Sequence, residues 1–324
     1  MLSLLLGISL AFLNYHGHNK INDKRKRNKH FWETIMDVKM IKNGFLEHRL
    51  GSWKEFSDLI ENKEFSWPTL IYRGQANADW KVESTLDRLE RLFPTTTYSV
   101  DGKSERFDRP PVWRELQLQR FKELCRGRLG TNPPLEKDED EWWALAQHHG
   151  LATPMLDWTY SPFVALFFAF ENEKFACGDK WSEPKERAVF ALCYHLIDDN
   201  AKENEETPKP FSPRSYASYR LINQGGLFLK MPTGKDIATY VSSHFTEDTY
   251  SEEPTGNRHA RPILQKIIIP NKERKECLWF LNKMNINRAS LFPDIDGAAK
   301  HTNNLWEIDF DSAIGNIPND LKSN

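Results

Sequence analysis

Residues Pro162–Phe170 (PFVALFFAF) form an uninterrupted apolar stretch near the middle of this 324-residue chain. A helix that is apolar on every side has to be enclosed by other elements, and a proline is tolerated in its first turn. The stretch is far shorter than the roughly 20 residues that span a bilayer. It therefore predicts a buried helix at the centre of a globular fold.

Shorter apolar runs supply the elements that would surround this helix. Runs rich in β-branched or aromatic residues predict strands at Pro68–Tyr72, Ala188–Leu196 and Ile263–Ile269. Apolar spacing of three and four predicts helices at Ser52–Ile60, Pro111–Arg128, Asp138–Gly150 and Lys272–Met284. The polar segment Thr95–Arg109 is expected to be a loop, and Lys202–Pro213 an exposed insertion. The irregular alternation favours an α+β fold, with a mixed or antiparallel sheet flanked by helices.

Composition excludes several functional classes. The chain has 44 Lys and Arg against 46 Asp and Glu, so its formal net charge is -2. A chain with this balance has no strong general attraction for nucleic acids or acidic membranes. Four scattered cysteines without zinc-finger spacing indicate a reducing compartment, and we expect neither disulfides nor bound metal. These features predict a cytoplasmic protein.

The N-terminus has an apolar run, Met1–Leu13, followed by a basic cluster between Lys20 and Lys29. Three interpretations stay open: translation that starts at Met36 or Met40, an anchor that leaves the rest in the cytoplasm, and a secretory signal. We expect a poorly packed leader at 1–40, one folded domain at 50–312 and a short tail at 313–324.

Three polar segments interrupt the apolar pattern. They are Leu70–Gln75 (LIYRGQ), Gln147–Pro162 (QHHGLATPMLDWTYSP) and Ala289–Lys300 (ASLFPDIDGAAK). In this order they resemble the FRG domain family, which is named for a Phe/Tyr-Arg-Gly signature. Here the signature is Tyr72-Arg73-Gly74, and the resemblance covers roughly Trp53 to Lys300.

A more distant resemblance connects the chain to ADP-ribosyltransferases of the arginine–serine–glutamate class. Arg73 corresponds to the arginine at the end of their first strand, and Asp157-Trp158-Thr159 to their second motif. Gln224 stands where their catalytic glutamate is expected. The resemblance implies an ADP-ribosyltransferase-like fold with NAD as substrate. It implies catalytic roles for Arg73, His149, Asp157 and Gln224, and cofactor binding by Tyr72, Gly74, Gln75, His148, Trp158 and Thr159.

The residue types are compatible with this chemistry. The planar fork of Arg73 suits a pyrophosphate, and Gly74 would allow a ligand to approach closely. Asp157 could stabilise positive charge that develops on a ribose, while His148 or His149 could exchange a proton. Each residue also has a structural interpretation. Arg73 could pair with Asp157, the histidines could cap a helix end, and Asp157-Trp158-Thr159 could cap the helix that begins at Pro162.

Three hypotheses of function follow. The first is a bacterial effector or defence protein that transfers ADP-ribose from NAD to a protein or nucleic acid, or hydrolyses NAD. The second is a catalytically inactive module that binds a nucleotide or phosphate through Arg73. The third is a nuclease that uses His148, His149 and Asp157. The segment Phe292–Gly297 lacks the alternating acids of a calcium loop and predicts a turn into a helix, capped by Asp294 or Asp296.

Overall fold

The computed structural model describes residues 44–61, 65, 70–93, 96–100, 103–107, 113–130, 133–172, 175–177, 180–195, 197, 207–214, 218–245, 250–252, 258–260 and 262–308. The expected leader 1–40, the tail 313–324 and residues 202–206 of the expected insertion lie outside this set. No helix among the described residues is long and apolar enough to cross a membrane.

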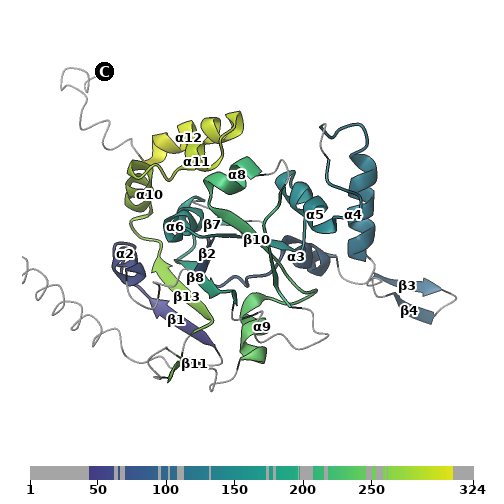
Figure 1. Cartoon of the computed structure of the whole chain (residues 1–324), viewed down its shortest axis with the longest axis horizontal. Helices are drawn as coiled ribbons and strands as arrows, with labels where there is room; N and C mark the ends of the chain where they lie inside the picture. Colours follow the sequence, from purple (N-terminus) through teal and green to yellow (C-terminus); the bar gives the residue numbers. More distant parts are fainter. Residues whose placement is uncertain are drawn as a thin grey trace, which may run out of the picture. The chain divides into compact units, whose positions relative to one another are not determined.

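A seven-stranded sheet forms the centre of the fold (Figure 1). Its order is β1 (Phe45–Arg49), β13 (Leu264–Pro270), β8 (Glu186–Cys193), β2 (Leu70–Gln75), β5 (Met155–Thr159), β10 (Gly226–Lys230) and β9 (Lys209–Phe211). Only β1 and β13 pair in parallel, and the other neighbours in this sheet are antiparallel. The expected α+β class with a mixed sheet is confirmed. The two most apolar predicted strands are the adjacent strands β8 and β13.

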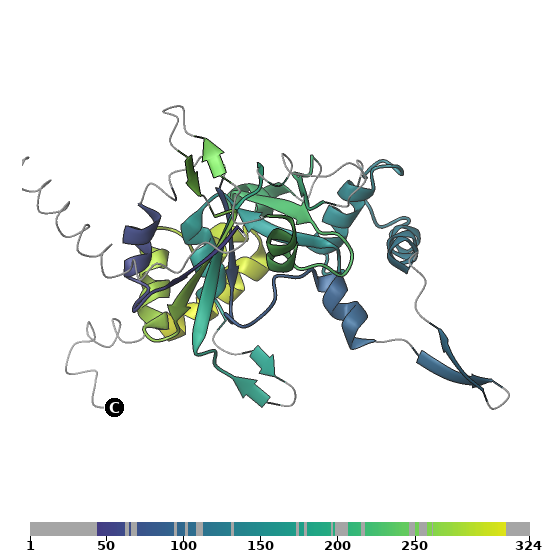
Figure 2. The ribbon, with the colours of Figure 1, turned by 90° about the horizontal axis from the view of Figure 1, so that it is seen from below.

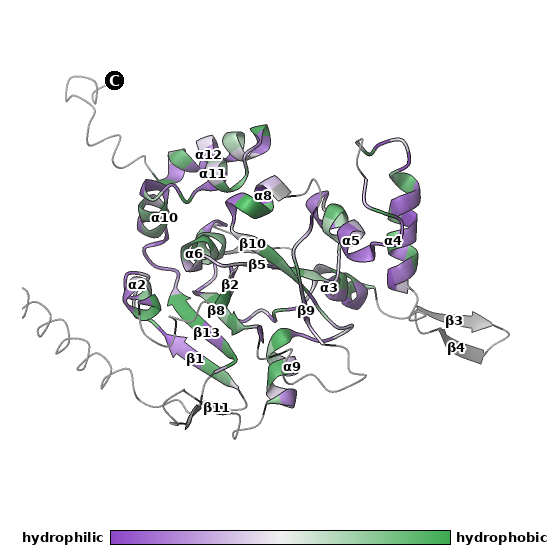
Figure 3. Ribbon diagram, in the orientation of Figure 1, coloured by the Kyte–Doolittle hydropathy of each residue, from purple (hydrophilic) through white to green (hydrophobic). Residues whose placement is uncertain are grey.

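Helices cover both faces of the sheet. Alternate residues of a strand point to opposite sides, and on the central strands the residues on both sides are apolar and have to be buried. On one face, Leu156, Leu227 and Phe190 belong to a core cluster that contains Ile237, Tyr240 and Val241 of α9 (Ile237–His244). On the other face, Met155 and Phe228 pack with residues of α3 (Thr85–Leu92), α4 (Trp113–Leu124) and α5 (Glu139–His148). The hydropathy colouring shows β8, β10 and β13 as largely apolar strands (Figure 3).

Helix α6 (Pro162–Phe170) is the predicted buried helix: six of its nine residues are buried, and the other three are half-buried. Ser161 caps its N-terminus by accepting a hydrogen bond from the Val164 amide at 3.3 Å. Thr159 accepts from the Ser161 amide at 3.0 Å, so of the two alternatives Thr159 does bond an amide at the helix start, whereas Asp157 bonds Gln147 instead. At the C-terminus, Arg187 donates to the Ala169 carbonyl at 2.5 Å and Arg274 to the Phe170 carbonyl at 2.7 Å. Two buried cations therefore complement the negative end of the helix dipole.

Gly74 is the point at which α6 approaches β2. A Cβ atom on Gly74 would lie 1.9 Å from the Ala165 carbonyl oxygen and 2.5 Å from the Ala169 nitrogen. These distances are far below van der Waals contact, so only glycine fits. We expected Gly74 to admit a ligand, but the group that approaches it this closely is the backbone of α6.

The segment Thr95–Arg109 contains a hairpin instead of the expected loop. Strands β3 (Thr96–Val100) and β4 (Lys103–Phe107) are antiparallel, with Val100 opposite Lys103. The sequence between them, Asp101-Gly102, is a dipeptide that favours hairpins, and this local signal was available although the strands are polar. The hairpin is a separate two-stranded sheet, and Figure 2 shows it projecting away from the seven-stranded sheet.

The remaining elements are small hairpins and helices. The hairpins are β6 (Phe175–Cys177) with β7 (Lys180–Ser182), and β11 (Tyr250–Glu252) with β12 (Arg258–Ala260). The helices are α2 (Glu55–Ile60), α8 (Ser218–Asn223), α10 (Arg274–Lys283), α11 (Arg288–Leu291) and α12 (Ile295–Ile308). Asp294 accepts from the Gly297 amide at 2.7 Å, which confirms the predicted turn and its cap before α12.

Candidate functional site

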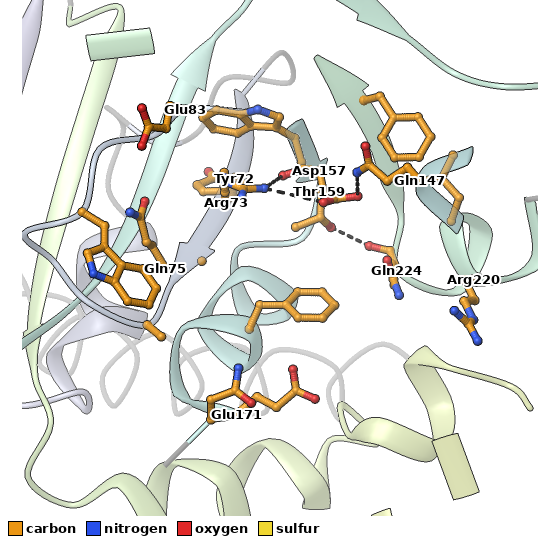
Figure 4. Close-up of a pocket in the computed structure, with 18 of the residues that line it drawn as sticks. Tyr72, Arg73, Gln75, Glu83, Gln147, Asp157, Thr159, Glu171, Arg220 and Gln224 are labelled. Carbon is orange, nitrogen blue, oxygen red and sulfur yellow. Dashed lines mark hydrogen bonds and ion pairs between the residues drawn. The ribbon is translucent and has the colours of Figure 1, made fainter. Parts of the chain in front are cut away.

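The sheet divides between β2 and β5. These strands pair only at Tyr72 and Thr159. Beyond that point β2 remains paired with β8 as far as Gln75, while β5 remains paired with β10 as far as Met155. A pocket of about 420 Å³ lies where the strands separate, and residues from both faces of the sheet line it (Figure 4). We call it the central pocket.

Arg73 extends from β2 toward β5. Its Nη1 donates to the Asp157 backbone carbonyl at 2.6 Å and lies 3.8 Å from the Asp157 carboxylate. Its Nε is buried and has no hydrogen-bond partner among the described residues. Burial lowers the pKa of the guanidinium, the carboxylate of Asp157 opposes this shift, and the positive charge of Arg88 adds to it. An arginine stays protonated nevertheless, so the pocket contains a fixed, incompletely hydrogen-bonded cation.

Asp157 presents its carboxylate to solvent. Its side chain is 63 % exposed, against 20 % for Arg73. Gln147 of α5 donates to Asp157 Oδ1 at 2.7 Å, and Gln147 in turn accepts from the Thr153 hydroxyl. The predicted pairing of Arg73 with Asp157 is present as an ion pair, but the shorter contact is to the backbone carbonyl. One oxygen of this carboxylate is held by Gln147, while the group as a whole stays accessible.

Gln224 reaches the central pocket from the turn before β10. Thr159 Oγ1 donates to the Gln224 carbonyl at 2.5 Å, and Gly225 has a φ of +53°, which favours glycine. The Gln224 side-chain amide donates to the Leu291 carbonyl at 3.1 Å. The side chain is thus hydrogen-bonded to α11, and it is one of several contacts between this turn region and the C-terminal helices.

Aromatic rings form much of the remaining wall: Tyr72, Trp80, Trp158, Phe168, Phe228 and Phe292. Phe168 and Phe292 contact each other edge to face at 6.1 Å between ring centroids. Burial raises the pKa of Tyr72 to about 12, so its phenol keeps its proton at neutral pH. Trp158 Nε1 and Gln75 Oε1 are buried without a hydrogen-bond partner in the described part of the chain. The pocket thus combines flat apolar surfaces with unsatisfied polar atoms.

The two histidines differ. His148 lines the central pocket, whereas His149 is exposed and is not among the lining residues. Burial lowers the pKa of His148, the charge of Arg220 and the neighbouring His149 lower it further, and Asp294 opposes them. His148 is therefore neutral at pH 7. All predicted site residues except His149 line one pocket, and their functional roles remain predictions.

Several lining residues could not be selected from the sequence. Four of them lie in segments that resemble an ordinary helix surface or a loop in the sequence: Trp80, Arg88, Glu171 and Arg220. Arg220 pairs with Asp294 at 2.5 Å, and Glu171 pairs with Arg288. The described residues contain no cluster of three or more His, Cys, Asp or Glu side chains that could hold a metal ion.

The fold and the pocket define an α+β protein with a ligand-sized pocket in a divided mixed sheet. The family model of the FRG domain matches residues 68–176, so the chain contains an FRG domain. The match includes β2 and β5 and with them Arg73, His148 and Asp157, while Gln224 and Phe292 lie outside it. No curated protein and no solved structure matches the chain.

Proposed function

We propose that the central pocket binds NAD and promotes cleavage of its nicotinamide–ribose bond, with transfer of ADP-ribose to a macromolecule or to water. The supporting observation is that Arg73, the accessible carboxylate of Asp157 and several aromatic rings line the same pocket. A fixed guanidinium suits phosphate, and aromatic rings suit stacking against adenine or nicotinamide. A pocket of about 420 Å³ is within the usual size of small-molecule sites.

The chemistry assigns one role to each group. The bond between ribose C1′ and the nicotinamide nitrogen breaks, and its electron pair leaves with neutral nicotinamide. Positive charge develops on the ribose, and the nearby carboxylate of Asp157 stabilises it. The acceptor oxygen or nitrogen forms the new bond to C1′ and loses a proton. Neutral His148 on the pocket wall is suited to accept this proton.

Nicotinamide release by the full-length protein, measured by chromatography, tests the proposal. Wild type should release nicotinamide, and Asp157→Asn should reduce the rate at least about tenfold, since the stabilising charge is lost and the shape is kept. Asp138→Asn is the matched control, because Asp138 lies outside the pocket and makes no capping hydrogen bond. Equal rates in the two variants, or no release with water or any acceptor, would contradict the proposed reaction.

A specific observation supports the second candidate, a nucleotide-binding module without catalysis. Gln224 stands where the resemblance to ADP-ribosyltransferases implies a catalytic glutamate, and its side-chain amide donates to the Leu291 carbonyl. Such a module would show stabilisation by NAD or ADP in a thermal shift assay while releasing no nicotinamide. The nuclease hypothesis has less support, because His149 does not line the pocket with His148 and Asp157.

A further inference from the structure

Arg88, a residue outside the three sequence segments, contributes a second guanidinium to the central pocket. It lies on α3 and lines the pocket together with Arg73. Within the described part of the chain, no carboxylate or carbonyl accepts a hydrogen bond or ion pair from its side chain. The two arginines are close enough for the charge of Arg88 to lower the pKa of Arg73. Two like charges thus face one pocket, which is unfavourable in the absence of an anion.

The lack of a partner for Arg88 does not reflect a lack of acids nearby. Glu83 binds Arg91 through both oxygens at 2.6 Å. Glu90 binds Arg114 at 3.1 Å. The acids of this segment are therefore committed to cations other than Arg88.

Asp87, the residue next to Arg88, is the most fully engaged of these acids. It pairs with Arg114, and it accepts from the Ser84 hydroxyl at 2.6 Å and from the Gly234 amide at 2.8 Å. Both of its carboxylate oxygens are therefore hydrogen-bonded to groups other than Arg88. On the pocket side, the only ion pair of Arg73 among the described residues is the 3.8 Å contact with Asp157. These two cations therefore have few acidic partners among the described residues, and an anion bound between them would add the opposing charge.

We propose that Arg88 and Arg73 together bind a diphosphate, one guanidinium to each phosphate group, so that the pocket selects diphosphate ligands over monophosphates. This inference rests on the proposed function and narrows it, since NAD carries such a diphosphate. A guanidinium group can donate two parallel hydrogen bonds to the oxygens of one phosphate group. A diphosphate offers one phosphate group to each of the two arginines, whereas a monophosphate can bind well to only one of them. Lys81, another lining residue without a side-chain partner among those described, adds positive charge at the same site.

Isothermal titration of the full chain with inorganic pyrophosphate, orthophosphate, ADP and AMP tests this inference. We expect wild type to bind ADP at least about tenfold more tightly than AMP, and pyrophosphate more tightly than orthophosphate. Arg88→Gln should remove most of this preference, and Arg88→Lys should restore part of it because charge returns without the fork. Arg126→Gln, an exposed arginine outside the pocket, is the matched control and should leave all four affinities unchanged.

The outcomes separate this inference from the proposed reaction. Equal affinities for ADP and AMP in wild type, or the same affinities in Arg88→Gln and Arg126→Gln, would overturn the inference even where nicotinamide is released. Loss of the diphosphate preference in Arg88→Gln alone would support it, even where wild type releases no nicotinamide. Thermal unfolding of each variant shows that a lost affinity does not come from a lost fold.

Discussion

Gly74→Ala tests the packing on which the central pocket depends. The added methyl group would lie 1.9 Å from the Ala165 carbonyl oxygen and 2.5 Å from the Ala169 nitrogen, and both are backbone atoms of α6. Relief requires α6 to move away from β2 by roughly 1 Å or more, because carbon–oxygen contacts below about 3 Å are strongly repulsive. Helix α6 is buried and its C-terminus is held by Arg187 and Arg274, so it cannot move without disturbing the core.

Ordinary overpacking costs about 1–3 kcal/mol, and a clash with backbone belongs at or above the upper end of this range. We expect Gly74→Ala to lower the free energy of unfolding by about 3 kcal/mol or more, with a melting temperature at least about 6 °C lower. Urea and thermal denaturation followed by circular dichroism measure this change. Gly130→Ala is the control, since a Cβ atom there meets no atom within 4 Å. A loss below about 0.5 kcal/mol for Gly74→Ala, comparable with surface substitutions, would refute the packing argument.

Three further predictions concern the pocket itself. Arg73→Lys keeps the charge but loses the fork, so NAD affinity should fall about tenfold with little change in melting temperature; unchanged affinity would exclude Arg73 as a ligand contact. Gln224→Glu removes the donor to the Leu291 carbonyl, so stability should fall by about 1 kcal/mol while nicotinamide release rises, and an unchanged rate would separate this position from catalysis. The pKa of His148 is lowered in the folded state, so the unfolded chain binds more protons, and stability should decrease as pH falls below about 6.5. His148→Gln should flatten this decrease in denaturation measured between pH 5 and 7, and an unaltered slope would contradict the assigned shift.

The sequence was sufficient for the elements whose signals are local. The apolar run at Pro162–Phe170 and the β-branched runs that became β8 and β13 require burial wherever they lie, so they predict their own structure. The polar hairpin of β3 and β4 also had a local signal, Asp101-Gly102, but its strands lack the apolar alternation on which the prediction of a loop relied. The sequence thus contains a signal for this hairpin, and the prediction of a loop gives too little weight to it.

The pocket was only partly predictable because it depends on contacts between distant segments. Arg73 and Asp157 could be paired in sequence by charge, but the 2.6 Å bond to the Asp157 carbonyl exists because β2 and β5 separate beyond Tyr72 and Thr159. No residue pattern specifies that separation. Arg88 carried no signal at all, since an arginine on a short amphipathic helix resembles a solvated surface charge. Its importance appears only when the carboxylates around it are seen to have other partners.

The Tyr-Arg-Gly signature therefore combines two kinds of requirement in adjacent residues. Tyr72 forms the one pair that joins β2 to β5 among the described residues, and Gly74 leaves room for the backbone of α6, so both serve the packing around β2. Arg73 lies between them and is the member of the triplet that presents charge to the pocket. A loss of activity therefore has a different meaning at Gly74 and at Arg73. A substitution of Gly74 disturbs the packing of α6 on β2, and with it the pocket that the packing supports. A substitution of Arg73 tests its role in ligand binding only if the melting temperature stays unchanged. Stability and ligand binding therefore have to be measured on the same variants.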